Sequence, residues 1–433
     1  MTFGRRILRE LPFALSVETL RSYGALMTGQ VGRLVFSLGY FLLLANALPL
    51  GEFGLFATCS AIGVTLSRVA AFGFVSPVYR AACSRPLTLG SYLSGYAIAL
   101  LLSLPLVALL AWAVHALVLA GTLAFATFAL VLVAEILLWR TAEVLVIVSN
   151  GLNRFMRASA IVIATAALRA GAAGLLLLRP DADLALWALF YVAANGLALL
   201  LASAFLLPRL RPRWTPALWW GRRRDAAGVA GAEVLFYAQA ELDKVLVLAL
   251  GGPALAGIYA ILLRLADLTA IPLRAMNTLL LQAIMRSRGA ARPWPVWVGI
   301  EAAVFAVSVA GLGTLALLLN VRPDALGENV ALAAGFVALI LFVPGFRNLV
   351  ELHTELLWGF ERPLERLAQL LAVGIGKAAL LATLLAATSD LHAFAWWLNG
   401  VFAALYLVSA AWTYAVIQTR PVGTGPVAAR AKA

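Results

Sequence analysis

The sequence predicts an all-α polytopic membrane protein with twelve transmembrane helices in two lobes of six. Hydrophobic residues make up 63% of the 433 residues, charged residues make up only 12%, and the mean hydropathy is +0.95. Soluble domains average about 45–50% apolar and about 25% charged residues, so a soluble fold cannot hide this much apolar surface. The apolar runs are also too long and too continuous for the strands of a membrane β-barrel.

Apolar stretches long enough to cross a bilayer, roughly 17–25 residues each, recur twelve times along the chain. Several of them exceed the bilayer thickness, which predicts tilted helices or helices that project into the cytosol. The first run is too long for the hydrophobic part of a signal peptide, and we expect it to be retained. The predicted spans are 22–48, 54–76, 91–115, 122–149, 157–178, 184–207, 226–250, 254–285, 294–319, 329–357, 363–386 and 392–418.

The basic residues predict the orientation of these spans. Segments on one side hold 22 of the 33 Lys and Arg residues, whereas the loops on the other side hold only Arg179 and Arg322. Basic residues collect on the cytoplasmic side of membrane proteins. Both termini are therefore predicted to be cytoplasmic. The net charge of +13 is explained by this topology, and no nucleic-acid partner is predicted.

The longest hydrophilic connection divides the chain into two halves. We predict an N-terminal six-helix lobe at 1–207, a basic cytoplasmic linker at 208–225, a C-terminal six-helix lobe at 226–418 and a disordered cytoplasmic tail at 419–433. Short matches link the halves: GLNR at 151–154 corresponds to GFER at 359–362, and FGLFA at 53–57 to AGIYA at 256–260. Six helices per half preserve orientation, so this pattern is typical of a parallel repeat.

Nine basic and nine acidic residues lie inside the predicted spans, where an isolated charge costs on the order of 2.5–3.5 kcal/mol. Helical spacing separates structural pairs from cavity residues, because residues three or four apart share a helix face. That spacing predicts the pairs Arg140–Glu143, Lys244–Glu241, Arg264–Asp267 and Arg347–Glu351. Five cations have no acid at such spacing on their own helix, and we predict that they line a cavity: Arg33, Arg68, Arg169, Arg274 and Lys377. An ion pair to another helix, or snorkelling of Arg274, is the competing interpretation.

A cavity lined by arginine selects an anion, because the guanidinium is always charged and forks onto phosphate oxygens. Acids left over in the spans are candidates for carrying protons or sodium. The ion-coupling or charge-pair candidates are Glu135, Glu233, Glu241, Asp243, Lys244, Asp267, Glu301 and Glu355. His353 lies between Glu351 and Glu355 and either joins them or is merely interfacial.

Several kinds of chemistry have no support in the sequence. No Walker motif and no HExxH motif are present, and no cofactor or metal site is predicted. Asp181 and Asp183 match the DxD tripeptide of some glycosyltransferases, but a solvated loop with a helix cap explains them as well. A charged Gly-rich loop after the second span, expected of major-facilitator transporters, is absent from PVYRAACSRPL.

One long segment carries a resemblance to a known family. AELDKVLVLALGGPALAGIYAILLRLADLTAIPLRAMNTLLLQAIMR (240–286) resembles the seventh and eighth helices of Wzx-type polysaccharide flippases, which share a superfamily with the MATE drug exporters and the lipid II flippase. The matching parts are Asp243-Lys244, Gly251-Gly252, the AGIY step at 256–259, and Arg264 with Pro272 following. LPLGEFGLFATC (48–59) resembles the turn between helices one and two. The extra helices typical of lipid II flippases are missing.

The resemblance implies a MATE-like fold with alternating access through an inverted V. It implies a flippase, not an enzyme, that moves an undecaprenyl-diphosphate-linked oligosaccharide across the bacterial inner membrane for O-antigen or exopolysaccharide assembly. A proton or sodium gradient, a polysaccharide polymerase and a chain-length regulator are the implied partners. Cavity cations on helices one, two and eight of the family correspond to Arg33, Arg68, Arg264 and Arg274. A MATE-type multidrug antiporter and a membrane glycosyltransferase or polymerase remain the alternatives.

Overall fold

The computed structural model describes residues 17–207, 213, 215–286 and 293–419. The predicted tail beyond residue 419, the first part of the predicted linker and the basic residues of 1–16 lie outside the described residues. Within the described ranges every regular element is helical. The structure therefore confirms the predicted all-α class.

The N-terminal half contains the helices that correspond to the first six predicted spans. A π-helical segment, Ala134–Trp139, joins α6 to α7 without a break. The elements are α2 (Val17–Ala47), α3 (Leu50–Val69), α4 (Val75–Ser84), α5 (Leu89–Val114), α6 (Phe125–Val133), α7 (Arg140–Gly151), α8 (Phe155–Leu177) and α9 (Leu184–Leu206).

The C-terminal half contains the remaining helices. Gly252 interrupts α11 with a φ of 79°, where the sequence predicts the turn Gly251-Gly252 between two spans. Glycine adopts this backbone conformation without steric cost, and Pro253 then starts the next helical stretch. The elements are α10 (Pro216–Glu241), α11 (Asp243–Leu268), α12 (Ala270–Arg286), α13 (Trp294–Val321), α14 (Glu328–Val337), α15 (Val343–Gly359), α16 (Pro363–Ala387) and α17 (Leu391–Thr419).

By length and apolar composition alone, eight helical runs in the described part of the chain are able to cross a membrane. One of these runs, Trp220–Leu268, contains most of α10 and all of α11. Other predicted spans fall on helices that are interrupted or charged: 329–357 is split between α14 and α15, and 122–149 carries Glu135, Arg140 and Glu143. These interruptions bring polar groups into the membrane region, where they are tolerated only if protein or a wet cavity surrounds them.

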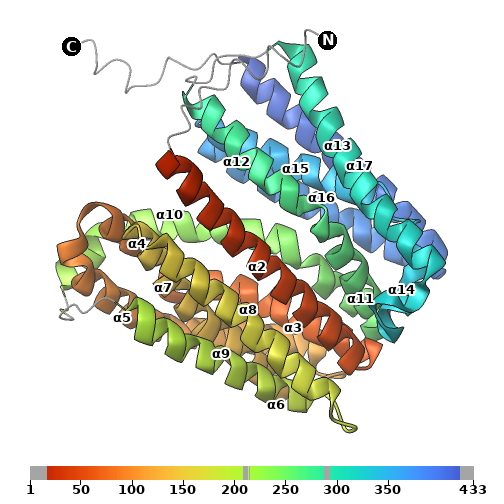
Figure 1. Ribbon diagram of the computed structural model, residues 1–433, viewed down its shortest axis with the longest axis horizontal. Helices are drawn as coiled ribbons and strands as arrows, with labels where there is room; N and C mark the ends of the chain where they lie inside the picture. The colour runs from red at the N-terminus through yellow and green to blue at the C-terminus, as the bar shows by residue number, and fades with distance from the viewer. Residues whose placement is uncertain (1–16, 208–212, 214, 287–292, 420–433) are drawn as a thin grey trace.

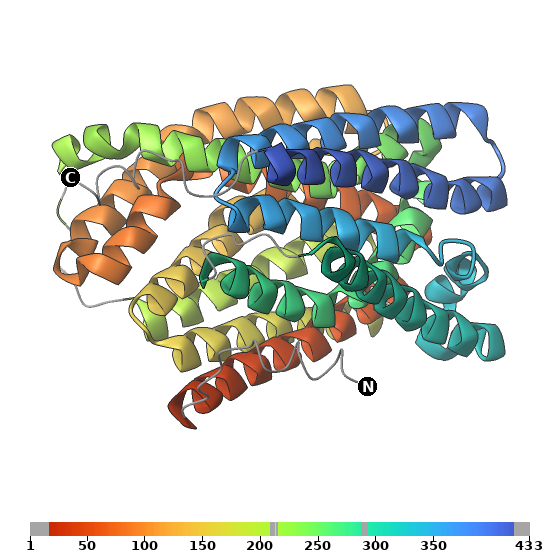
Figure 2. The ribbon, with the colours of Figure 1, turned by 90° about the horizontal axis from the view of Figure 1, so that it is seen from above.

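The two halves form a V (Figure 1). They lie together where α3 packs against α11, and they diverge toward the end that holds the start of α2 and the end of α17. The first helix of each half packs against the fifth: α2 lies along α8 in both Figure 1 and Figure 2, and α10 contacts α16. A parallel repeat predicts this matched pairing.

Close packing seals the narrow end of the V. Asn329 donates from its side-chain amide to the carbonyls of Ala45 and Leu48, each at 2.7 Å, and Asn46 donates to the carbonyl of Leu326 at 2.9 Å. These bonds join the end of α2 to the start of α14. The narrow end is therefore closed by contacts between the two halves.

Helix α10 links the halves toward the wide end of the V. Its early turns pack against the N-terminal half, where Gly73 leaves room for Ala226 and Ala230, and it also contacts α16 of the C-terminal half. The helix begins at Pro216, inside the predicted linker 208–225. Proline is favoured at the first position of a helix, so the basic stretch that follows it extends the helix beyond the apolar span.

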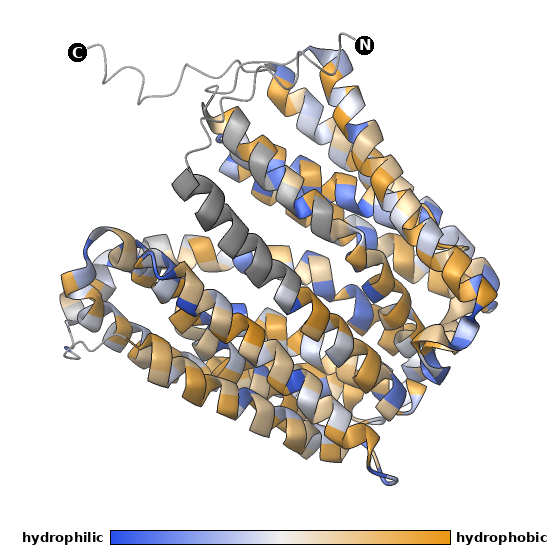
Figure 3. Ribbon diagram, in the orientation of Figure 1, coloured by the Kyte–Doolittle hydropathy of each residue, from blue (hydrophilic) through white to orange (hydrophobic). Residues whose placement is uncertain are grey.

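Hydrophobic residues predominate along the helices (Figure 3), and many large ones are exposed on the surface of the bundle. In α5, for example, Leu101, Leu102 and Leu109 are all at least 60% exposed. Soluble monomers rarely expose apolar surface on this scale, whereas lipid solvates it without cost. The distribution is that of a membrane protein.

Candidate functional site: a cationic cavity between the halves

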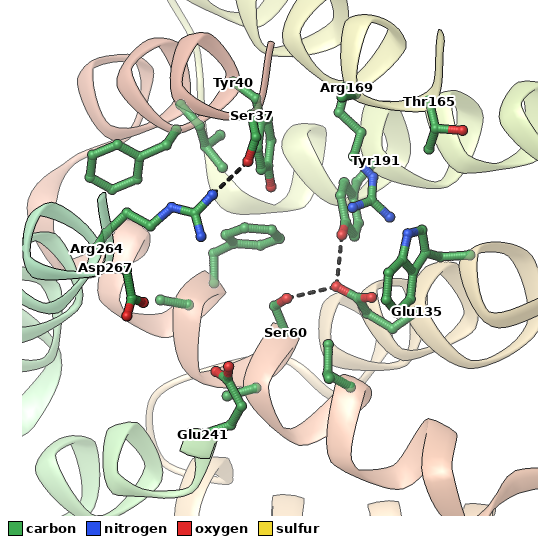
Figure 4. A pocket seen from close by; sticks show the side chains of 18 of the residues that line it. Ser37, Tyr40, Ser60, Glu135, Thr165, Arg169, Tyr191, Glu241, Arg264 and Asp267 are labelled. Carbon is green, nitrogen blue, oxygen red and sulfur yellow. Dashed lines mark hydrogen bonds between the residues drawn. The ribbon is translucent and has the colours of Figure 1, made fainter. Parts of the chain in front are cut away.

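A cavity of about 540 Å³ lies between the two halves. Its walls come from α2, α3, the π-helical segment, α7, α8 and α9 on one side and from α10, α11 and α15 on the other (Figure 4). The charged residues that line it are Arg33, Glu135, Glu143, Arg169, Glu241, Lys244, Arg264, Asp267 and Arg347.

Three cations of this cavity have no carboxylate within ion-pair distance among the described residues: Arg33, Arg169 and Arg264. Arg264 donates from Nη2 to the hydroxyl of Ser37 at 2.6 Å, across the two halves. Arg33 is exposed and stands one turn before Ser37 on α2. Positive charge from both halves therefore faces the same space.

Arg169 is held in place by neutral groups. It donates to Oδ1 of Asn195 from Nε (3.0 Å) and Nη2 (2.5 Å), and its guanidinium lies 5.2 Å from the ring centroid of Tyr191 and 5.4 Å from that of Trp139. Aromatic faces stabilise a cation without neutralising it. Arg169 therefore keeps a full positive charge at the cavity wall.

Glu135 is the one unpaired acid of the described cavity wall. It is 2% exposed and accepts hydrogen bonds from Ser60 (2.6 Å) and from the hydroxyl of Tyr191 (2.7 Å). Tyr191 thus touches both Glu135 and Arg169, as Figure 4 shows. Glu135 sits on the π-helical segment, and such segments often occur at functional sites.

The remaining charges of the cavity wall are paired. Lys244 contacts Glu241, and Arg140 contacts Glu143 at 2.5 Å, so both of these predicted pairs are confirmed. The predicted pairs Arg264–Asp267 and Arg347–Glu351 are wrong. Asp267 instead lies 3.0 Å from Arg347, and Glu351 lies 3.0 Å from Arg274. The spacing of residues along one helix carries no information about ion-pair partners on another helix.

Three of the six predicted cavity cations, Arg68, Arg274 and Lys377, do not line the cavity. Arg68 is 3% exposed, contacts Glu143 at 3.0 Å and lies over the ring of Tyr237, 4.1 Å from its centroid. Each of the three forms an ion pair with a carboxylate on a different helix, as the alternative interpretation of the sequence predicted. The expectation that these cations face the cavity is therefore corrected, because pairing across helices already compensates their charge.

The acid candidates outside the cavity are also engaged across helices. Glu233 of α10 lies 3.0 Å from Arg140, and Glu355 lies 3.1 Å from Arg366. Asp243 lies 3.0 Å from Lys377 and accepts from the hydroxyl of Tyr259 at 2.9 Å. Glu301 contacts His353 at 2.9 Å. His353 thus pairs with Glu301 of α13 and not with Glu351 or Glu355.

The sequence interpretation overlooked the neutral side chains of the site, above all Ser37, Ser60, Tyr191 and Asn195. Their only signal is a polar residue inside an apolar run, which is too common to single out a position. Asp183, in contrast, accepts from the backbone N–H of Leu186 at 2.7 Å and caps α9. The solvated helix cap therefore accounts for Asp183 in the DxD tripeptide.

Neither a protein-family model nor a curated protein sequence matches the chain. Solved structures do match it in fold. An inward-facing multidrug resistance MATE family transporter of the MOP superfamily has a TM-score of 0.66 at 11% identity, covering 89% of this chain and 94% of its own. A MOP superfamily transporter from Pyrococcus furiosus Vc1 (DSM3638), described as having a binding pocket of reverse polarity that suggests a different function, has a TM-score of 0.61 at 12% identity and coverages of 91% and 94%.

A third solved structure also matches the fold. An outward-facing multidrug resistance MATE family transporter has a TM-score of only 0.56 at 11% identity and coverages of 91% and 94%. This TM-score is lower than that of the inward-facing transporter. The chain has the MATE fold, an architecture found in membrane transporters.

Proposed function

We propose that this MATE-fold chain is a flippase that moves an undecaprenyl-diphosphate-linked oligosaccharide across the bacterial inner membrane. The observation that carries the proposal is the set of three arginines, Arg33, Arg169 and Arg264, that face the cavity without a carboxylate partner among the described residues. A diphosphate presents several oxygens to such a set. The guanidinium groups bind phosphate oxygens in a fork and stay charged at every physiological pH.

Charge balance within the cavity favours an anionic headgroup over a cation. Lys244 and Arg347 are neutralised by Glu241 and Asp267, and Glu143 faces two arginines of its own wall. Among the described charged residues of the cavity wall, three cations and one acid, Glu135, are then left without an ion-pair partner. A bound diphosphate offsets this excess positive charge, whereas a bound cation adds to it.

The V suggests the route of the substrate. With the predicted orientation, the wide end faces the cytoplasm and admits the headgroup, while the lipid tail stays in the membrane beside the halves. Closing the wide end and opening the narrow end then exposes the headgroup outside, driven by a proton or sodium gradient. A polymerase and a chain-length regulator are the proposed partners that receive the glycan.

The cavity arginines provide the test of this proposal. Because a hydrogen bond to a charged group contributes about 1.5–3 kcal/mol, Arg33→Gln and Arg264→Gln are each expected to weaken headgroup binding about tenfold or more. Both variants are expected to fail in complementing a flippase-null strain. Arg322→Gln, which changes a predicted outer loop, is the matched control. Normal polysaccharide export by both cavity variants contradicts the proposal.

A MATE-type multidrug antiporter is the second candidate, favoured by Glu135 in the cavity wall and by the named activities of the structural neighbours. This function predicts efflux of cationic dyes. Glu135→Gln is then expected to abolish efflux, while Arg33→Gln leaves it intact. The flippase proposal predicts that dye efflux is absent from the wild type.

A further inference from the structure

A second buried polar cluster lies in the C-terminal half, away from the central cavity. Glu301 of α13 accepts hydrogen bonds from the hydroxyls of Tyr406 (2.6 Å) and Tyr414 of α17, and its Oε1 lies 2.9 Å from Nε2 of His353 on α15. His353 is fully buried, and the side chain of Glu301 is 14% exposed. A carboxylate and an imidazole are thus enclosed together among three helices.

The charge of this carboxylate has no permanent counter-ion among the described residues. Helices α13 and α17 carry no other Asp, Glu, Lys or Arg. On the other helices around the cluster, the charged groups are engaged elsewhere: Arg366 with Glu355, Arg274 with Glu351, and Lys377 with Asp243. A buried unpaired carboxylate is costly in a membrane protein. One added proton makes the imidazole a cation and removes this imbalance.

Ser409 allows the imidazole to hold or release that proton. Nδ1 of His353 lies 3.1 Å from Oγ of Ser409, which accepts from the side-chain amide of Gln369 at 2.9 Å. A serine hydroxyl has one donor and two acceptor positions. Ser409 therefore donates to Nδ1 when the imidazole is neutral and accepts from it when the imidazole is charged. Both protonation states keep the same partners.

Sodium does not suit this site. The hydroxyl hydrogens of Tyr406 and Tyr414 already point at the carboxylate, and His353 presents a nitrogen. Hard cations are held by several oxygen lone pairs. Within the described ranges no cluster of three or more His, Cys, Asp or Glu side chains could hold a metal ion. The cluster fits a proton better than a metal cation.

We propose that Glu301 and His353 form a proton-binding site in the C-terminal half, and that it exchanges one proton during transport. Gln369 connects it to α16, which also carries Lys377 and packs against α10, the helix that joins the halves. The use of this proton in coupling rests on the proposed transport function, whereas the binding of the proton does not.

Proton binding is tested by NMR on the full-length protein in lipid nanodiscs, with ¹⁵N-labelled histidine. The chain has only three histidines, His115, His353 and His392. We expect the ring nitrogens of His353 to show both a neutral and a charged form as the pH is varied. Ser409→Ala removes the partner of Nδ1 in both protonation states, whereas Glu301→Gln removes the negative partner of the charged form. Glu301→Gln is therefore expected to change the balance between the two forms relative to the wild type.

The other two histidines serve as internal controls. His392 faces Asp390 at the surface, 3.8 Å away, and its signal is expected to be unchanged in both variants. His115 packs against Phe125 and Phe128, so its unchanged signal reports that the variants are folded. A His353 signal that keeps one protonation state over the whole pH range overturns the proposal. So does a response of His353 to pH that is the same in the wild type and in folded Glu301→Gln protein.

Coupling is tested in proteoliposomes that hold an undecaprenyl-diphosphate-linked oligosaccharide. An imposed pH gradient is expected to drive its translocation in the wild type and in His392→Gln, and not in His353→Gln, which still binds the lipid. Translocation driven equally well by a sodium gradient without a pH gradient overturns the coupling role. Failure of the flippase function has a different signature: the wild type neither binds nor moves the lipid, while His353 still shows both forms.

Discussion

Replacing Asp243 by alanine while Lys377 stays in place is expected to destabilise the protein by about 3–5 kcal/mol, the usual cost of leaving one member of a buried ion pair alone. The two side chains are 2% and 6% exposed, and their charged atoms lie 3.0 Å apart. Asp243 also accepts from Tyr259 and from the backbone N–H of Lys244 at 2.9 Å. The loss is measured as a drop in the thermal unfolding temperature in detergent.

A double variant separates this charge effect from a packing effect. Asp243→Asn combined with Lys377→Met removes both charges and nearly preserves side-chain volume, and replacing a buried ion pair by matched neutral groups is often close to neutral. The double variant is therefore expected to recover most of the stability lost in Asp243→Ala. If it unfolds as readily as the single variant, the pair is not the source of the stability. Asp390→Asn, at an exposed helix cap, is the surface control.

Gly54→Ala and Gly257→Ala are expected to prevent the narrow end of the V from closing. A Cβ at Gly54 would lie 2.5 Å from the backbone nitrogen of Gly257 and closer still to the carbonyl oxygen of Pro253, and a Cβ at Gly257 would meet the carbonyl oxygen of Leu50. These neighbours are backbone atoms, which cannot move away from an added methyl group as the end of a flexible side chain can. We expect each variant to cost roughly 1–3 kcal/mol, as overpacking does, and to separate α3 from α11.

The two native cysteines report this opening. Cys59 lies on α3 five residues after Gly54 and is fully buried, whereas Cys83 is exposed. Alkylation of Cys59 relative to Cys83 is expected to rise in Gly54→Ala and Gly257→Ala. Gly39→Ala is the matched control, because a Cβ there meets nothing within 4 Å. Cys59 protection that is unchanged in both variants shows that the narrow end tolerates the added methyl group.

The agreement between predicted and observed helix bounds differs from one element to the next. The spans 157–178 and 184–207 match α8 and α9 within two residues at each end, because long apolar runs bounded by polar turns predict both type and extent. The linker was less predictable, since Pro216 and the arginines after it read as a loop but form the start of α10. The length of the apolar runs predicts some helices that project into the cytosol, but hydropathy does not show that this basic stretch belongs to one of them.

The residues of the candidate site were also predicted only in part. Arg33 and Arg169 were predicted as cavity residues because no acid lies near them on their own helix, and Arg264 was predicted from the family resemblance. All three line the cavity. Arg68 and Lys377 also lack an acid nearby on their own helix. In the structure they pair with Glu143 and Asp243 on other helices. His353 similarly meets Glu301, 52 residues away, and not the acids beside it on its own helix.

The sequence by itself thus determined the membrane class, the helical content and the set of charges that the membrane must accommodate, because hydropathy and helical periodicity are local properties. Only the tertiary structure decided which of those charges neutralise one another and which remain free. The physical reason is that an ion pair or a hydrogen bond depends on distance in space. A carboxylate 3 Å away can lie on any of the helices that the fold brings alongside.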